Sequence, residues 1–94
     1  MTQAAALIAP TLDSLAVNVP ARIASVDWAS LAEEEALRLV ALGLDVGAVV
    51  RVVHRGVFLG ADPLAVEVGR MTVALRRVHA RAMRIEPVAD KASP

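Results

Sequence analysis

The sequence predicts a mainly β domain with one helix, arranged as a small antiparallel β-barrel with a helical insertion after the first strand. One early strand pattern precedes a single helical pattern, and four short strand patterns follow it. The later connections are too short for the crossovers that parallel strands need. A strongly bent barrel of the SH3-like kind closes most strand edges, so this element order favours it.

The chain begins with a lead, a turn and the first strand. Residues 11–15 form a short lead-in. Asn18 and Pro20 then predict a tight turn, because asparagine tolerates the left-handed backbone conformation. Residues 22–26 predict a strand, although Ile23 and Val26 are three positions apart and therefore alternate imperfectly.

The helix has both a start and a stop signal. Ser30 and Glu33 fit a capping box, which predicts a helix that begins near Ser30. Three glutamates, residues 33–35, fall in its first turn, where the helix dipole favours negative charge. Gly43 predicts the C-terminal stop, with Leu44 folded back onto Leu39.

A helical projection separates two faces of this helix. The predicted inner face holds Ala36, Leu39, Val40 and Gly43, and the opposite face holds Glu34, Glu35 and Arg38. Leu42 falls among the charged residues, where it is either a lone exposed leucine or a contact for a partner.

The four later strand patterns occupy residues 48–53, 64–68, 71–75 and 83–86. The first is rich in valine, and the other three alternate apolar residues with other residues. Gly69 and Arg70 predict a hairpin between the third and fourth strands of the fold. Residues 55–62 form the longest loop, and residues 76–81 predict a short helical turn.

Length and composition fit one small domain. The chain has 94 residues, 56% of them apolar but with one Trp and one Phe, so small aliphatic side chains must fill the core. We expect a domain over residues 11–87, with flexible ends at 1–10 and 88–94.

The absence of cysteine excludes disulfides and thiolate chemistry. No signal-peptide pattern and no membrane-length apolar run is present, so we expect a soluble protein without membrane insertion.

The net charge is zero, but the charged residues are unevenly distributed along the chain. Residues 1–50 hold two basic and six acidic side chains, whereas residues 51–94 hold eight basic and four acidic ones. The basic half is either a solvated face or a steering surface for a partner. Arg76, Arg77, Arg81 and Arg84 could follow a phosphate backbone. Nucleic acid is nevertheless an unlikely partner, because Trp28 and Phe58 are the only aromatic stacking groups.

The sequence offers no catalytic or metal-binding motif. His54 and His79 lack further ligands at a suitable spacing, and each is expected to be solvated or hydrogen-bonded. Consecutive glutamates at 33–35 point in different directions around a helix and do not form an acid–base pair. Gly43 and Gly47 precede a strand and lack the lysine of a phosphate loop.

Several segments in order resemble the FeoA family, the ferrous iron transport protein A group, over residues 11–87. The matching segments are 38–44 (Arg-Leu-Val-Ala-Leu-Gly-Leu), Gly47, 49–53, 62–64 (Asp-Pro-Leu), 74–77 (Ala-Leu-Arg-Arg) and 85–87 (Ile-Glu-Pro), preceded by Thr11, Leu15, Arg22 and Ile23. The chain departs from the family pattern at Phe58, where a proline is expected, at the extra Ala61, and at Asn18, where glycine is usual.

The resemblance implies an SH3-like barrel with a helical insertion, a cytoplasmic location and no enzymatic activity. It also implies docking on the membrane GTPase permease that imports ferrous iron, ferrous iron transport protein B. Iron would then be the cargo of that partner. We expect no cofactor, and a position at the inner face of the membrane would come only through the partner. The alternative is a nucleic-acid-binding or metal-dependent regulatory SH3-like module, and self-association through an open barrel edge stays open.

We predict a partner-binding surface on the helix, in the long loop and in the basic segment. Its residues are Leu39, Leu42, Phe58, Leu59, Arg76 and Arg77. Instead of contacting a partner, Leu39 could belong to the core, and Phe58 could cover the end of the barrel as a lid. The two arginines are expected to steer the partner.

Overall fold

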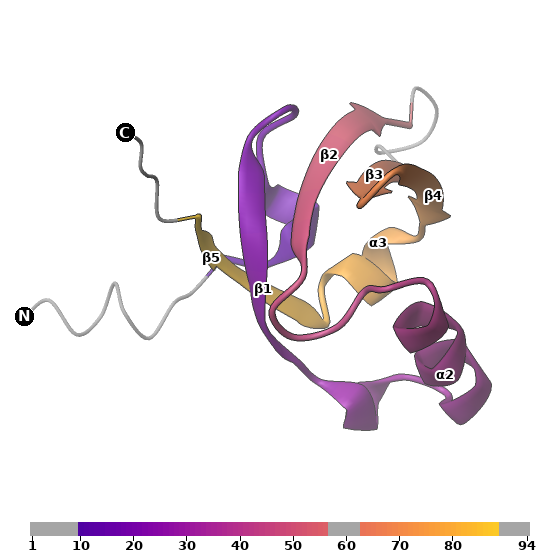
Figure 1. The fold of residues 1–94 in the computed structure, drawn as a ribbon. Helices are drawn as coiled ribbons and strands as arrows, with labels where there is room; N and C mark the ends of the chain where they lie inside the picture. Colours follow the sequence, from indigo (N-terminus) through magenta and orange to yellow (C-terminus); the bar gives the residue numbers. More distant parts are fainter. Residues whose placement is uncertain (1–9, 57–62, 89–94) are drawn as a thin grey trace, which may run out of the picture.

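The computed structural model describes residues 10–56 and 63–88, which form a mainly β fold with one longer helix (Figure 1). In chain order the elements are η1 (Leu12–Ser14), β1 (Pro20–Val26), η2 (Trp28–Ser30), α2 (Glu33–Ala41), β2 (Val49–Arg55), β3 (Leu64–Val68), β4 (Met71–Leu75), α3 (Arg77–Ala80) and β5 (Met83–Pro87). The predicted fold class is therefore confirmed, including the four strands after the helix and the short helical turn before the last strand. The predicted flexible ends lie outside the described residues, apart from Pro10 and Val88.

The strands form one antiparallel sheet in the order β4-β3-β2-β1-β5. In Figure 1 the sheet bends strongly, with α2 beyond one end of it and α3 on the connection between β4 and β5. Among the described residues no ladder joins β4 to β5, so these two strands are the edges of the sheet.

The imperfect alternation of the first strand has a structural cause. The β1–β5 register shifts between Ile23, which pairs with Ile85, and Ser25, which pairs with Arg84. Such a bulge adds one residue to one strand and bends it locally. Ile23 is buried, whereas Ala24 and Ser25 are both exposed. The spacing that weakened the strand pattern is therefore the bulge that bends β1.

The core is aliphatic, as the composition predicts. It contains leucine, isoleucine, valine, alanine and methionine side chains, and no buried polar or charged residue occurs in the described parts of the chain. Alternate residues of β3 supply three of its members, Leu64, Val66 and Val68. Burial of these apolar side chains supplies most of the stabilisation, at about 25 cal/mol per Å² of apolar area.

The predicted capping box is wrong. Residues 28–30 form the turn η2, and the Ser30 hydroxyl donates to the carbonyl oxygen of Asp27 at 2.9 Å. The helix α2 starts three residues later, at Glu33, with Ala32 as its N-cap and no side-chain cap. Ser30 is thus used by the preceding turn and is not available to the helix.

The C-terminal stop of α2 follows the prediction. Gly43 has a φ of +96°, and its amide donates to Val40 while the Leu44 amide donates to Leu39, each at 2.9 Å. These two bonds define a Schellman motif. Leu44 is thereby folded back beside Leu39, and both side chains are fully buried.

Gly43→Ala is expected to lower the free energy of unfolding by about 1–2 kcal/mol, because an L-residue is strained at positive φ. A Cβ at this position would also lie 3.3 Å from Cγ1 of Val68. Gly47→Ala is the matched control, since its φ is +94° and nothing lies within 4 Å of the added Cβ. Urea unfolding should show a larger loss for Gly43→Ala, and equal losses would show that the Val68 contact is unimportant.

Candidate functional site

The predicted partner-binding residues occupy different environments. Leu39 is fully buried in the core, so in this structure it cannot contact a partner and instead anchors α2. Leu42, the C-cap of the helix, is half-buried. Arg76 is exposed between β4 and α3, and Arg77 is half-buried at the start of α3. Phe58 and Leu59 lie outside the described residues.

The exposed face of α2 carries an apolar pair, of which the sequence projection misplaced Val40 and did not consider Leu37. Val40, predicted to face the core, is 43% exposed, and Leu37 is 64% exposed. The two residues are three positions apart and therefore adjacent on the helix surface. We call this pair the α2 ridge. Glu33 is one turn before Leu37, so the ridge combines apolar groups with negative charge.

A side-chain approach links α2 to α3. The Glu35 carboxylate is 2.6 Å from the Arg38 guanidinium, and its Oε2 is 3.9 Å from Nδ1 of His79. His79 was expected to be solvated or hydrogen-bonded, but its side chain is 17% exposed and Nδ1 is buried without a hydrogen-bond partner. Nδ1 therefore departs from that expectation, and the Glu35 carboxylate lies beside it. His54, by contrast, is exposed.

The described residues contain no cluster of three His, Cys, Asp or Glu side chains that could hold a metal ion. The longest described helix, α2, is too short and too charged to cross a membrane, and no other helix in the same residues could do so. The described surface also contains an apolar groove.

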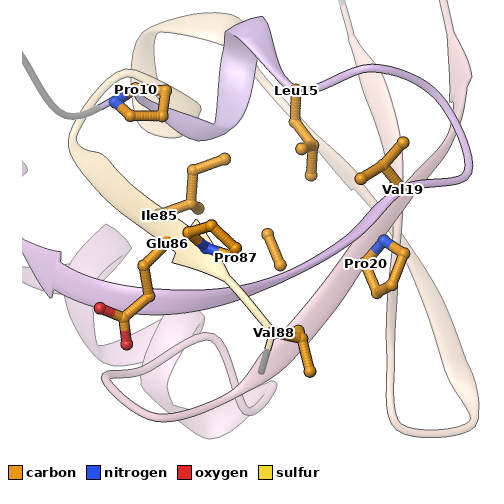
Figure 2. A pocket seen from close by; sticks show the side chains of 9 residues that line it. Pro10, Leu15, Val19, Pro20, Ile85, Glu86, Pro87 and Val88 are labelled. Atoms are coloured by element: carbon orange, nitrogen blue, oxygen red, sulfur yellow. The ribbon is translucent and has the colours of Figure 1, made fainter. Parts of the chain in front are cut away.

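The groove lies between the N-terminal lead and strands β1 and β5 (Figure 2). Its volume is about 370 Å³, and it is lined by Pro10, Leu15, Val19, Pro20, Ala21, Ile85, Glu86, Pro87 and Val88. Figure 2 shows the carboxylate of Glu86 pointing away from the space between Leu15 and Ile85. The interior of the groove is consequently apolar.

Two sets of hydrogen bonds hold the wall of the groove in place. The Ile85 amide donates to the carbonyl oxygen of Pro10 at 2.9 Å. The Arg55 guanidinium donates to the carbonyl oxygens of Asp13, at 2.9 Å, and of Leu15. The end of β2 thus fastens the lead that carries Leu15.

Sequence reasoning did not find this groove. Pro20 was interpreted as part of a turn and Pro87 as part of the family resemblance, but the β1–β5 register pairs Ala21 with Pro87 and brings the two prolines to one surface. The sequence did contain a signal for an apolar surface, because prolines stand at the ends of elements. A proline ring is apolar, and the residue has no amide N–H donor. The convergence of the two prolines depends on the pairing register, which the sequence alone does not specify.

The chain matches the FeoA domain family over residues 11–87. A crystal structure of FeoA from Stenotrophomonas maltophilia, complexed with zinc, has 35% identity and a TM-score of 0.70, with 83% of this chain and 91% of that chain covered. That protein is described as a prokaryotic SH3 domain protein and a candidate activating factor of ferrous iron transport. Iron(II) transport protein A from Clostridium thermocellum has 26% identity and a TM-score of 0.73, with 84% of this chain covered. The chain spans 46% of the length of that protein.

A manganese-dependent transcriptional repressor is also similar, with 19% identity, a TM-score of 0.71, and coverage of 85% of this chain and 42% of that chain. At this identity the likeness shows a shared fold and does not decide between an accessory and a regulatory role. No curated protein matches the chain. The family match extends across all the described strands and helices, and the chain therefore belongs to the FeoA domain family, which is associated with ferrous iron transport.

Proposed function

We propose that this chain is a non-enzymatic, cytoplasmic accessory protein of ferrous iron uptake. It docks on the cytoplasmic part of the membrane GTPase permease, ferrous iron transport protein B, and modulates its assembly or activity. The observation that carries the proposal is the FeoA domain match over residues 11–87. FeoA domains are small accessory domains and are not a known enzyme family.

The α2 ridge is the surface that we assign to this docking. Exposed Leu37 and Val40 provide apolar contact area on a helix that Leu39 anchors in the core. Interfaces gain most of their affinity from a few well-packed residues that are surrounded by contacts which exclude water. Because Glu33 lies one turn from Leu37, the expected complement is an apolar patch of the permease with basic residues at its rim.

The other predicted contact residues belong to this proposal with a lesser role in docking. Leu42 lies at the end of the same helix, and Arg76 and Arg77 supply positive charge that could steer an acidic part of the partner. Phe58 and Leu59 stay proposed contacts of the loop between β2 and β3. Leu39 is no longer proposed as a contact, because its burial assigns it to the core.

Ferrous iron uptake by cells tests the role directly. Cells that keep the permease but lack the gene for this chain should take up radioactive ferrous iron more slowly, and expression of the chain should restore the rate. Cells without the permease are the control, and there the chain should change nothing. Equal uptake with and without the chain, in the presence of the permease, would contradict the proposal.

A further inference from the structure

The outer edge of β4 offers main-chain hydrogen-bonding groups that no other strand of the described residues uses. β4 pairs only with β3 among the described residues, and it is the last strand on its side of the sheet (Figure 1). Unpaired strand edges are templates for another strand unless charge, proline or a covering segment blocks them. The sequence of β4, Met-Thr-Val-Ala-Leu, contains neither a charged residue nor a proline.

The hairpin geometry identifies the groups that point outward. Val68 pairs with Met71 across Gly69 and Arg70, and the φ of +59° at Gly69 fits a type II′ turn. The pair that closes such a hairpin is hydrogen-bonded, and bonded and non-bonded pairs then alternate. Thr72 and Ala74 fall in the non-bonded pairs, so their N–H and C=O groups face away from β3. Both residues are exposed.

Charged side chains bracket this edge. Arg70 precedes β4 and Arg76 follows it, and both are exposed. Neither arginine forms an ion pair within residues 10–56 and 63–88. They are six positions apart in the sequence, which spans at most about 22 Å of chain. Arg70 lies in the turn and Arg76 is the N-cap of α3, so the two arginines stand at the two ends of the strand that carries Thr72 and Ala74.

A second copy of the chain fits this edge poorly in the register that uses both outward-facing residues. The two-fold register that pairs Thr72 with Ala74 of the second copy also places Arg70 opposite Arg76 of that copy, at both ends of the strand. Like charges directly opposite each other destabilise a strand pair. The edge therefore favours a different strand, with negative charge where this chain has arginine.

We propose that β4 binds an extended segment of a partner protein by strand addition, in which Thr72 and Ala74 supply the main-chain hydrogen bonds. The segment has an uncharged stretch opposite β4 and an acidic residue at each end, opposite Arg70 and Arg76. Alternate side chains of the segment cover the exposed face of Thr72 and Ala74. The site is separate from the α2 ridge, and its test does not involve the permease.

A synthetic peptide tests this site on the full chain. The probe alternates valine and threonine between two terminal aspartates, with its length matched to the separation of Arg70 and Arg76. In an NMR titration it should shift the amide signals of residues 70–76 and protect the Thr72 and Ala74 amides from hydrogen exchange. The same peptide with terminal lysines is the control and should bind at least about tenfold more weakly.

Two variants separate strand addition from unspecific binding. Thr72→Pro removes an outward-facing N–H without removing a bond to β3, so the fold should persist while the affinity falls at least about tenfold. The double variant Arg70→Glu and Arg76→Glu changes only exposed side chains and should reverse the preference toward the lysine peptide. This second variant keeps the test valid if Thr72→Pro does not fold.

Three results would overturn the proposal. The first is equal affinity for the aspartate and lysine peptides. The second is signal changes confined to the groove or to the α2 ridge. The third is self-association of the chain that protects Thr72 and Ala74 without any peptide, because a second copy would then be the occupant of the edge.

Discussion

Leu39→Ala is expected to lower the free energy of unfolding by about 2–5 kcal/mol, which is the usual cost of emptying a fully buried leucine site. Leu39 is fully buried and packs in the core, where it joins α2 to the sheet. A domain of this size has a total stability of only about 5–15 kcal/mol, so the variant should unfold at clearly lower urea concentration.

Leu37→Ala is the matched control, since it makes the same chemical change on the same helix at a position that is 64% exposed. Its effect should stay within about 0.5 kcal/mol. Equal losses for the two variants would contradict the described orientation of α2. They would also remove the reason for assigning the ridge to a partner.

The double variant Leu37→Glu and Val40→Glu is expected to weaken binding to the cytoplasmic domain of the ferrous permease at least tenfold, or by about 1.4 kcal/mol or more. Both side chains are exposed, and glutamate is a good helix former, so the fold should be retained. Calorimetric titration of the permease domain measures the affinity, and thermal unfolding checks that the variant is folded.

Val19→Glu provides the control for location. Val19 is 45% exposed and lines the groove, on a different surface from α2. It should leave the affinity for the permease domain unchanged. If Val19→Glu weakened binding and the ridge variant did not, docking at the ridge would be wrong and the groove would be the contact surface.

Most of the fold could be predicted because the informative patterns are local. Alternation of apolar residues predicts β3, whose residues Leu64, Val66 and Val68 are all buried. A glycine directly after a helical pattern predicts the stop at Gly43, which adopts the left-handed conformation. Even the irregular spacing between Ile23 and Val26 is meaningful, because it marks the bulge in β1.

The failures occurred where one local pattern had two structural uses. Ser30 has the sequence of a helix cap, but its hydroxyl closes the preceding 3₁₀ turn. The helical projection correctly placed Leu39 inside, yet it also placed Val40 there. Leu39 is the one buried residue of this short helix, so the pattern of the other residues does not specify how the helix is rotated about that anchor.

The candidate surfaces depend still more on tertiary structure. The groove exists because the β1–β5 register brings Pro20 and Pro87 together and because Arg55 fastens the lead that carries Leu15. The open edge of β4 follows from the strand order, which no local pattern encodes. Sequence reasoning nevertheless selected Arg76, and the structure places it at the end of this edge.

Titration of the permease's cytoplasmic domain with the unaltered chain is the most direct measurement of the proposed docking. We predict saturable binding at micromolar concentration or tighter, which corresponds to about 8 kcal/mol of binding free energy or more. Absence of binding at these concentrations, with both proteins shown to be folded, would contradict the proposed role as a docking accessory of the permease.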